Sequence, residues 1–520
     1  METERMNYPI GVQDFEDLRR KNFVYVDKTR QIYEIVTHGK YYFLGRPRRF
    51  GKSLLLSTIE AYFLGKKELF NGLAIEKLEK EWAEYPVLHL DLNTGKYDSV
   101  KSLHDEFNRH LEKWEAEFGD HFKDRKPSER FLQVIEQAYR KTGLQVVVLV
   151  DEYDKPLLQN FSDTRLQDEL RAEMKSFYSV LKTQDRYIRF AFLTGVTKFG
   201  KVSVFSDLNN LDDISMDERY ADICGITEQE LHETFDGEIE QLAKKLDVTF
   251  LEACSKLKEK YDGYHFCPRG TGVYNPFSLL NCLNKREISD WWFETGTPTF
   301  LVQLLQDCDY DLNSLQQGEI MAEDISKVDT VEGNPIPMLY QSGYLTINGY
   351  DKRFGTYILD FPNKEVENGF IKSILPYYVK NRSGNSKLMV TQFVKDVRRG
   401  DPEAFLNRLQ TFFEDADYRV AGKKEIYFQN VMFIIFKMMG FYTKVERATA
   451  RGRIDVVIKT KDYIYIIECK LDGSADEALR QIEEKGYAKP YATDPRKLFK
   501  IGINFSSEIR GVSEWKVNDK

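Results

Sequence analysis

The sequence predicts an α/β protein in which a doubly wound parallel-sheet domain is followed by a helical middle region and by a second, smaller α/β domain. Three observations predict this order. Residues 1–222 alternate continuous apolar runs with amphipathic segments, which is typical of strands covered by helices on both faces. From 223 to 365 the apolar spacing becomes mainly helical, and 366–415 continues as a helical connector. Residues 416–520 show the order helix, strand, strand, helix, strand.

The bulk composition fits a globular protein of several domains. A chain of 520 residues suggests roughly three domains, and 42% hydrophobic with 30% charged residues is ordinary for a soluble fold. No run of about 18 apolar residues is present and the N-terminus is acidic, so we expect neither a membrane span nor a signal peptide. The six cysteines are scattered without a CxxC pair, which favours reduced thiols and a cytoplasmic setting. The net charge of −8 argues against a broad basic surface but leaves room for a local basic groove.

Four strands are predicted in the first domain, near 41–44, 87–92, 146–150 and 188–193. The first strand leads into the loop Gly45-Arg46-Pro47-Arg48-Arg49-Phe50-Gly51-Lys52-Ser53, after which a helix begins. This is the layout of a P-loop, whose N–H groups cradle a phosphate chain while Lys52 reaches the terminal phosphates and Ser53 holds Mg²⁺. Arg46 occupies the position of the usual first glycine, since Gly45 stands one residue early. For this segment alone, a chance Gly-Lys-Ser at a helix start is the alternative.

Polar side chains follow the third and fourth of these strands. Asp151 and Glu152 come directly after the aliphatic run of the third strand, and Thr194 ends the fourth. Beside a P-loop, Asp151 would hold the Mg²⁺ shell, Glu152 would polarise a water, and Thr194 would contact the γ-phosphate region. The alternatives are solvated acids at a strand end and an ordinary strand-end cap at Thr194. The order of the segments favours a nucleoside-triphosphate site.

A β-hairpin is predicted late in the middle region. Strand-type residues at 344–347 and 357–361 flank a loop at 348–355, and Pro362 ends the second strand. A hairpin that follows a group of helices resembles the wing of a winged-helix domain. The middle region is therefore predicted to be helical and winged-helix-like.

The last block carries two strands that bring charged residues face to face. Its predicted elements are, in order, a helix at 423–439 closed by Gly440, strands at 453–459 and 463–469, a helix with the capping box Ser474–Glu477, and a strand at 498–505. If the two strands form a hairpin centred between Lys461 and Asp462, Asp455 lies directly opposite Glu468.

Facing carboxylates about 4.5–5.5 Å apart at Cβ repel each other unless a cation lies between them. All-oxygen ligands suit Mg²⁺ or Mn²⁺, so Asp455 and Glu468 predict such a site. Lys470 lies on the strand face of Glu468 and can orient a water or stabilise charge on a phosphate. The alternative is a solvated hairpin with a cross-strand salt bridge.

Five motifs of the N-terminal half resemble the AAA-ATPase-like family of bacterial proteins. They are Arg46-Pro47-Arg48-Arg49-Phe50-Gly51-Lys52-Ser53, Asp151-Glu152-Tyr153-Asp154-Lys155-Pro156, Ser203-Val204-Phe205-Ser206-Asp207-Leu208-Asn209-Asn210-Leu211, Tyr261-Asp262-Gly263-Tyr264-His265-Phe266 and Tyr274-Asn275-Pro276-Phe277-Ser278. The resemblance covers roughly residues 5–280, and the missing first glycine is itself typical of that family. It implies a P-loop NTPase fold that binds ATP with Mg²⁺. The candidate ligands of the nucleotide and its metal are Arg49, Gly51, Lys52, Ser53, Asp151 and Thr194, with Glu152 in a catalytic role.

The C-terminal Asp…Glu-x-Lys arrangement resembles the PD-(D/E)XK nuclease superfamily over about 416–506. The resemblance implies an α/β restriction-endonuclease-like domain with Lys470 as the catalytic lysine. Its implied metal ligands are Asp455, Glu468, the Cys469 carbonyl and Glu425. Gln481 matches a glutamine found in many members, whereas Phe428 stands where members often carry His. The basic stretch Tyr442–Arg453 either binds phosphates beside this centre or is a solvated loop.

The leading hypothesis is an ATP-regulated, metal-dependent nuclease that acts on nucleic acid phosphodiesters, with DNA favoured over RNA. The alternative is a nucleotide-dependent switch or scaffold that binds nucleic acid without cleaving it. The intact trio Asp455, Glu468 and Lys470 favours the enzyme. An ATPase motor on nucleic acid is a weaker hypothesis, because the sequence shows no clear arginine finger or helicase-type motif. Homo-oligomerisation stays open.

Overall fold

The computed structural model divides into two compact units. One comprises Met1–Gly296, Gln317–Glu332 and Ile336–Val366, and the other comprises Thr297–Gln316, Gly333–Pro335 and Glu367–Lys520. The structure describes residues 7–119, 124–198, 210–293, 301, 304–305, 308, 310–315, 318–326, 328, 334–378, 386–414, 424–440, 444–449, 454–509 and 511–519. Each unit is built on a five-stranded sheet.

The sheet of the first unit is parallel and has the strand order β2-β3-β4-β1-β5. Its strands are β1 (Tyr41–Gly45), β2 (Val87–Asp91), β3 (Val146–Asp151), β4 (Ile188–Gly195) and β5 (Asp212–Asp213). The four predicted strands are confirmed, and β5 is a two-residue addition that the sequence analysis did not predict. Because β4 lies between β1 and β3, Thr194 on β4 lies between the strand that leads into the P-loop and the strand that ends in Asp151.

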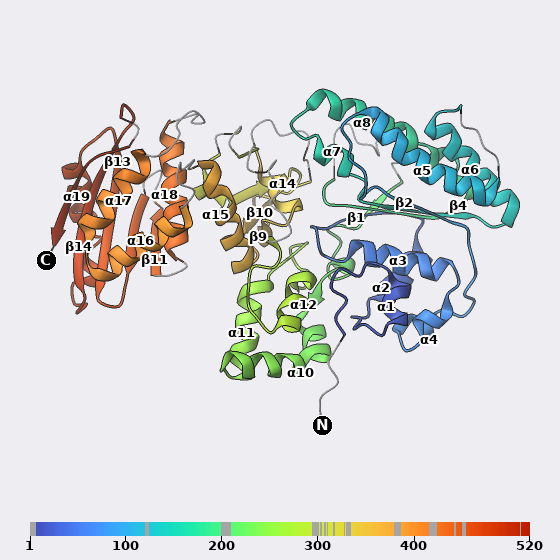
Figure 1. The fold of residues 1–520 in the computed structure, drawn as a ribbon, viewed down its shortest axis with the longest axis horizontal. Coiled ribbons are helices and arrows are strands. Elements are labelled where there is room, and N and C mark those ends of the chain that lie inside the picture. Colours follow the sequence, from blue (N-terminus) through green and yellow to red (C-terminus); the bar gives the residue numbers. More distant parts are fainter. Residues whose placement is uncertain are drawn as a thin grey trace. The chain divides into compact units, whose positions relative to one another are not determined.

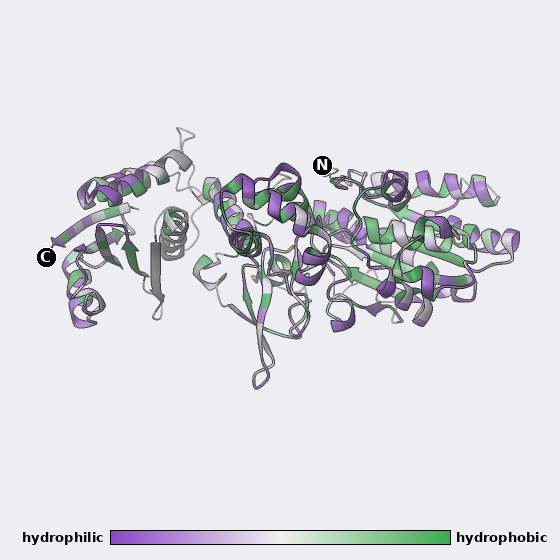
Figure 2. Ribbon diagram, turned by 90° about the horizontal axis from the view of Figure 1, so that it is seen from below, coloured by the Kyte–Doolittle hydropathy of each residue, from purple (hydrophilic) through white to green (hydrophobic). Residues whose placement is uncertain are grey.

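Helices cover both faces of this sheet (Figure 1). On one side α3 (Lys52–Phe63) packs against β2, β3 and β4, and α1 (Phe15–Arg20) packs against α3. On the other side α5 (Val100–Phe118), α6 (Pro127–Thr142) and α8 (Thr164–Tyr178) form a second layer. The strands of this sheet are accordingly hydrophobic (Figure 2), and all six residues of β3 are buried. The shorter helices are α2 (Thr29–His38), α4 (Ala74–Leu78), α7 (Lys155–Gln159) and α9 (Val180–Thr183).

Three helices follow the sheet in the same unit. They are α10 (Glu228–Leu246), α11 (Phe250–Tyr261) and α12 (Pro276–Lys285), with the short strands β6 (Ile226–Thr227) and β7 (Val273–Tyr274) between them in space. Capping boxes start α10 at Thr227 and α11 at Thr249. Apolar residues of these helices, including Phe235 and Leu257, form one buried cluster that also takes in Tyr8 from the N-terminal segment.

The predicted hairpin is confirmed as β9 (Thr346–Asp351) and β10 (Thr356–Asp360). It is widened by β8 (Gly318–Met321), which was not predicted, into a sheet of order β8-β10-β9. The short helix α14 (Ile336–Gln341) precedes it. The β9–β10 hairpin, labelled in Figure 1, projects from the neighbouring elements in Figure 2.

The second unit combines helices with a mixed sheet of order β11-β12-β13-β14-β15. Its helices are α15 (Lys364–Tyr378, whose first residues belong to the first unit), α16 (Ser386–Arg399), α17 (Pro402–Glu414), α18 (Lys424–Gly440) and α19 (Ala475–Glu484). Its strands are β11 (Lys444–Thr449), β12 (Ile454–Lys459), β13 (Tyr463–Leu471), β14 (Lys497–Ser506) and β15 (Gly511–Asp519). Only β13 and β14 pair in parallel, with α19 as their crossover. The predicted helix–strand–strand–helix–strand order is confirmed, and β11 and β15 extend it at both edges.

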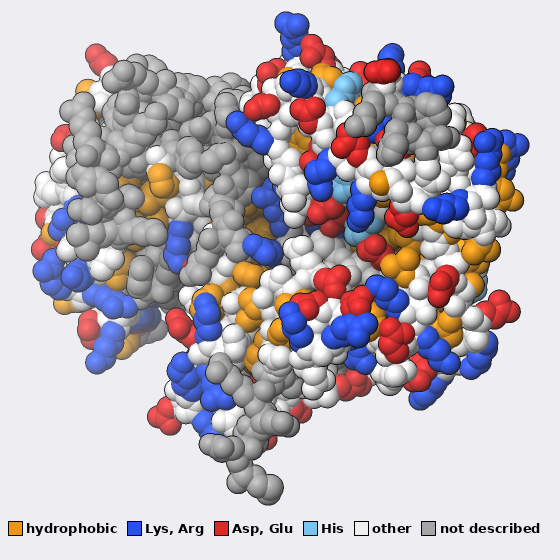
Figure 3. All heavy atoms as spheres, turned by 45° about the vertical axis from the view of Figure 1, so that its right-hand side comes forward, with side chains coloured by type: hydrophobic (Ala, Val, Ile, Leu, Met, Phe, Trp, Pro, Cys, Tyr) orange, Lys and Arg blue, Asp and Glu red, His pale blue; other side chains and the backbone are white. Residues whose placement is uncertain are grey.

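Surface and composition agree with the sequence analysis where they can be compared. On the face shown in Figure 3, Lys and Arg side chains are interspersed with Asp and Glu, in keeping with the net charge of −8. Cys224, Cys254, Cys267 and Cys282 are free thiols. Within the described ranges, no helix combines the length and apolar character that crossing a membrane requires.

A buried ion pair holds the helical layer above the first sheet together. Arg130 on α6 donates to both carboxylate oxygens of Glu115 on α5, at 2.7 Å each, and to Asn108 Oδ1 at 2.6 Å. Both charged side chains are almost completely buried. Such a pair adds little over an apolar contact, but losing one member leaves the other charge buried without a partner.

We therefore expect Arg130→Ala to lower the free energy of unfolding of the N-terminal unit by about 3–5 kcal/mol. Urea unfolding followed by circular dichroism measures the change. Arg165→Ala is the matched control, because it removes an exposed ion pair with Glu169 and should change the free energy by less than about 0.5 kcal/mol. Equal losses in the two variants would contradict the role of the buried pair.

Candidate functional site

The loop between β1 and α3 has the backbone of an anion-binding turn. Gly51 precedes α3 with φ 92° and ψ 18°, a left-handed conformation that suits glycine, and Arg49 also has a positive φ of 68°. No side chain caps α3, so the N–H groups of its first turn are available to a ligand. A helix N-terminus of this kind favours a phosphate.

Arg46 explains how the loop forms without its usual glycine. Its side chain turns into the protein core, where the guanidinium donates to the carbonyls of Gly45, Ser215 and Tyr220 at 2.7–3.0 Å. The guanidinium also lies 4.0 Å from the ring centroid of Phe266. Burial, the largest influence, lowers the pKa of Arg46. The residue is therefore a buried anchor of the loop rather than a group facing the phosphate side.

The parallel register brings most of the predicted nucleotide residues to one edge of the sheet. Lys52 is buried, and its ammonium lies 3.2 Å from Glu152 Oε1 and donates to the carbonyls of Arg46 and Pro47. Thr194 donates its hydroxyl proton to Asp151 Oδ1 at 2.6 Å. Gly51 and Ser53 flank Lys52 in the chain. Lys52, Asp151, Glu152 and Thr194 thus form one polar cluster beside the start of α3.

Arg49 lies apart from this cluster. Its guanidinium is 4.8 Å from the ring centroid of Phe277, which belongs to α12. The described structure thus joins the loop to the following helices through Arg49 as well as through Arg46.

Asp154 belongs to the same edge but was not among the predicted site residues. It is fully buried, and its Oδ2 accepts hydrogen bonds from Val196 N, Thr197 N and the Thr197 hydroxyl at 2.6–3.0 Å. Burial, followed by the negative charge of Glu152, raises the pKa of Asp154 to about 6. Asp154 therefore ties the loop after β4 to the loop that carries Glu152. The signal in the sequence was its place two residues beyond the acid pair.

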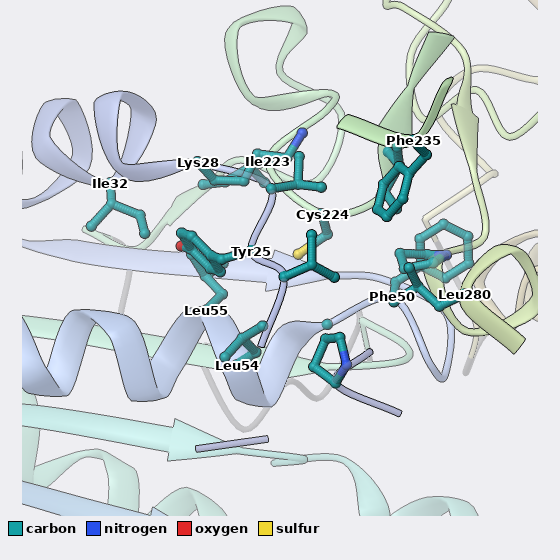
Figure 4. A pocket seen from close by; sticks show the side chains of 17 residues that line it. Tyr25, Lys28, Ile32, Phe50, Leu54, Leu55, Ile223, Cys224, Phe235 and Leu280 are labelled. Carbon is teal, nitrogen blue, oxygen red and sulfur yellow. The ribbon is translucent and has the colours of Figure 1, made fainter. Parts of the chain in front are cut away.

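An apolar cavity of about 100 Å³ adjoins the start of α3 (Figure 4). Its walls come from the N-terminal segment, from α3, and from the helices after the sheet. They include Tyr25, Phe50, Leu54, Cys224 and Leu280. Lys28 also lines it, but its ammonium is held by both carboxylate oxygens of Glu230 at 2.5 and 2.7 Å. The cavity therefore offers an apolar slot next to the anion-binding turn, a combination that suits a nucleotide base beside its phosphates.

Aromatic residues from the later part of the unit hold the loop from behind. Phe50 contacts Tyr264 and Phe266 edge to face, with centroids 4.7 and 5.5 Å apart. Beside Tyr264, the chain passes close to Pro362, and only glycine fits at position 263, since a Cβ there would lie 2.1 Å from the Pro362 carbonyl oxygen and its φ is 93°. The motif around Tyr264 is thus a structural support of the P-loop.

Trp292 links the loop to a buried acid. Its indole N–H donates to the Arg48 carbonyl at 3.2 Å, and its backbone N–H donates to Glu365 Oε1 at 2.8 Å. Glu365 is fully buried, and burial raises its pKa to about 7. The chain from Arg48 to Glu365 spans more than three hundred residues of sequence and was not visible to the sequence analysis.

The second cluster lies on β13 and α19. Asp455 on β12 pairs with Glu468 on β13 in the register predicted from the turn at Lys461 and Asp462. Glu468 is fully buried, its Oε1 accepts a hydrogen bond from Lys470 at 3.1 Å, and its Oε2 has no hydrogen-bond partner among the described residues. A buried carboxylate oxygen without a partner is the group that a cation would satisfy. Glu468 therefore offers one oxygen to a divalent metal, whereas no group of three His, Cys, Asp or Glu among the described side chains is placed to hold one.

Lys470 is oriented by its neighbours. Its ammonium donates to Gln481 Oε1 on α19 as well as to Glu468. Gln481 is buried, so the hydrogen bond holds Lys470 beside the carboxylate. Cys469 lies between the two charged residues and pairs with Ile503 of β14.

Parts of this cluster fall outside the described side chains. Glu425 lies on α18 and Asp455 on β12, but the structure describes only the backbone of both residues. Arg447 is on β11 with the same limit, and positions 450–453 of the basic stretch lie outside the described residues. The motif at 203–211 lies largely outside them as well.

Comparison with known proteins gives the same two parts. A family model described as predicted AAA-ATPase matches residues 9–205, and one described as PD-(D/E)XK nuclease superfamily matches residues 423–515. An Azotobacter chroococcum protein described as "Uncharacterized protein in vnfD 5'region" is 36% identical over 98% of both chains. Among solved structures, the Aeropyrum pernix ORC2 protein in its ADPNP–ADP complexes is 11% identical, with a TM-score of 0.24 over 72% of this chain and 97% of that one.

The buried Glu365 predicts a pH dependence of stability. Its pKa of about 7 in the folded chain exceeds its ordinary value of 4.5, so folding favours the protonated acid. The resulting stabilisation is fully present below the ordinary pKa and is lost as the pH rises through about 7. Glu365→Gln is therefore expected to weaken the fall in thermal midpoint between about pH 5 and about pH 8. The same fall in the variant and the parent chain would show that Glu365 does not titrate as proposed.

Proposed function

Because this chain belongs to the AAA-ATPase-like family and ends in a PD-(D/E)XK nuclease superfamily domain, we propose that it is an ATP-binding, metal-dependent nuclease whose cleavage of nucleic acid is controlled by nucleotide. The observation that carries the proposal is the contact of Glu468, Lys470 and Gln481, with Asp455 in register opposite Glu468. We place the activity in the cytoplasm, with DNA as the favoured substrate, and homo-oligomerisation as an open property.

The N-terminal cluster supports ATP binding. In this proposal the N–H groups around Gly51 and the Lys52 ammonium hold the phosphates. Arg49 would have to turn away from Phe277 to join them. Ser53 and Asp151 would hold Mg²⁺, while Thr194 fixes the orientation of the Asp151 carboxylate through its hydroxyl. The apolar cavity beside the loop would take the base.

Lys52 and Glu152 form an ion pair in the absence of nucleotide. Their ion pair, 3.2 Å long, holds Lys52 over the carbonyls of the loop. A bound phosphate chain would take over Lys52 and thereby release Glu152 to accept a hydrogen bond from a water. Glu152 has a positive φ of 52°, so its backbone is already held in an uncommon conformation at that edge.

The C-terminal cluster supports phosphodiester hydrolysis. Asp455, Glu468 and the Cys469 carbonyl would hold the metal, with Glu425 as a further ligand from α18. Mg²⁺ or Mn²⁺ would supply Lewis-acid polarisation of the phosphate. The Lys470 ammonium is a hydrogen-bond donor and not an acceptor, so it can bind a water or a phosphate oxygen beside the cation. Gln481 fixes its position.

The first test is cleavage of single- and double-stranded DNA and RNA with Mg²⁺ or Mn²⁺. Glu468→Gln and Asp455→Ala are each expected to reduce cleavage at least about 100-fold, because each removes a metal-binding carboxylate. Glu484→Gln, an exposed change on α19, is the matched control and should cleave like the parent chain. Cleavage that survives both site changes would exclude this centre. An absence of cleavage by the parent chain, with nucleotide binding intact, would favour the switch or scaffold.

The second test concerns control by nucleotide. Lys52→Ala is expected to abolish detectable ATP binding and any effect of ATP on the cleavage rate, because the buried ammonium at the loop is lost. Lys101→Ala, an exposed change on α5, should bind ATP normally. If the parent chain cleaves at the same rate with and without nucleotide, and Lys52→Ala does likewise, the two sites act independently.

A further inference from the structure

The sheet β8-β10-β9 concentrates exposed apolar side chains at one end. Six large hydrophobic side chains are exposed among the described residues, and three of them are on this small sheet: Met321, Tyr350 and Phe354. Phe354 is the most exposed of the three, at 66%. Single exposed apolar side chains are ordinary, whereas a cluster of them marks a contact surface.

Pairing places these residues together. Thr356 of β10 lies opposite Met321 of β8 on one side and Asp351 of β9 on the other. Tyr350 pairs with Tyr357, and their ring centroids are 5.2 Å apart. The end of the sheet formed by Met321 and residues 350–356 is called the hairpin end below.

The turn of the hairpin end is held firmly. Gly355 N donates to the Asp351 carbonyl at 2.9 Å, Arg353 N donates to Asp351 Oδ1 at 2.8 Å, and Ala322 N donates to the Gly355 carbonyl at 2.9 Å. Gly355 has a φ of 66°, which its missing side chain makes easy. Phe354 is therefore presented on a hydrogen-bonded turn that includes the end of β8.

Two cations directly precede Phe354 in the chain. Lys352 and Arg353 are both exposed, and the guanidinium of Arg353 lies 5.9 Å from the ring centroid of Phe354. The acid within the turn, Asp351, is engaged by the Arg353 N–H and lies 3.6 Å from its guanidinium. Further acids, Glu319 and Glu323, lie on and just after β8. The extreme tip of the turn thus combines positive charge with an aromatic ring.

We infer that the hairpin end is a nucleic-acid contact, in which Phe354 packs against bases while Lys352 and Arg353 neutralise phosphates. Cations beside an apolar wedge or stacking ring match a polyanion whose bases are apolar on their faces. The choice of a nucleic acid as the partner rests on the proposed nuclease function. The contact is a separate surface from the metal cluster and lies on the unit that carries the P-loop.

The base of this sheet is attached to the P-loop. A Cβ at Gly343, just before the hairpin, would lie 2.6 Å from Pro47, so the two segments touch. Tyr344 packs on Trp292, which donates to the Arg48 carbonyl. A nucleic acid bound at the hairpin end would therefore contact a sheet that packs against the P-loop. Any effect of nucleic acid on nucleotide affinity would be matched by an equal effect of nucleotide on nucleic-acid affinity.

The test uses the full chain carrying Glu468→Gln, so that nucleic acid is bound without cleavage. Fluorescence anisotropy with short duplex and single-stranded DNA and RNA measures the affinity. Phe354→Ala is expected to weaken binding about 10-fold, the loss of one stacked or wedged side chain. Lys352→Ala with Arg353→Ala should reduce the slope of log affinity against log salt by about two. Leu251→Ala and Lys101→Ala, exposed changes on α11 and α5, are the matched controls and should bind like their parent.

Unchanged binding in all hairpin variants, with thermal midpoints equal to the parent, overturns the inference. So does a parent chain that binds none of the four nucleic acids, or hairpin variants that keep nucleic acid and lose only flotation with anionic phosphatidylserine vesicles. Failure of the nuclease proposal is read separately, from cleavage by chains with Glu468 intact. If the hairpin variants lose duplex binding while the parent chain never cleaves, the nucleic-acid contact is supported and the nuclease proposal is rejected.

Discussion

The parallel pairing of β1, β4 and β3 is the constraint on which the N-terminal site depends. Gly45 stands opposite Gly195, Leu44 opposite Thr194, and Asp91 opposite Asp151, so the carboxyl ends of these strands reach one edge together. Parallel strands cannot be joined by tight turns, and each crossover returns the chain to the opposite edge. The loop proposed to bind phosphate and the acids proposed to bind a cation therefore meet without being near each other in sequence.

Three ionisable side chains that support this edge are buried. Arg46, Asp154 and Glu365 are all withdrawn from solvent, and each is bonded to backbone groups of a distant segment. Charges that are satisfied by backbone groups fix a geometry, because moving the segment would leave them buried without partners. Each of these groups also has one buried atom without a hydrogen-bond partner among the described residues, namely Arg46 Nε, Asp154 Oδ1 and Glu365 Oε2. The same holds in the second unit for Glu468 Oε2, while Glu468 Oε1 accepts a hydrogen bond from Lys470. Near the proposed nucleotide site the unpartnered atoms belong to side chains that anchor loops, whereas in the proposed metal site the unpartnered oxygen belongs to a proposed metal ligand.

Much of this arrangement was predictable from local sequence, and the reasons for success and failure are physical. The four long strands of the first sheet were visible because burial on both faces requires unbroken apolar runs, as in β3. The opposition of Asp455 and Glu468 followed from a two-residue turn, which fixes a hairpin register. By contrast, β5 has two acidic residues and β15 is polar along much of its length, so neither shows a buried-strand pattern. The roles of Arg46 and Trp292 depend on Phe266 and Arg48, which lie more than 200 residues away in the sequence, and no spacing rule can predict such contacts.

The support of the P-loop by late segments has a consequence for how the chain matures. Every residue proposed to bind phosphate lies before residue 200. The loop is nevertheless held by contacts with Phe266, Trp292 and Gly343, which come later in the sequence. During synthesis from the N-terminus, a nascent chain displays the nucleotide motif long before these supports leave the ribosome. The loop gains its full packing only when the hairpin has been made. Synthesis thus delays a finished nucleotide site until the surface that we assign to nucleic acid is present as well.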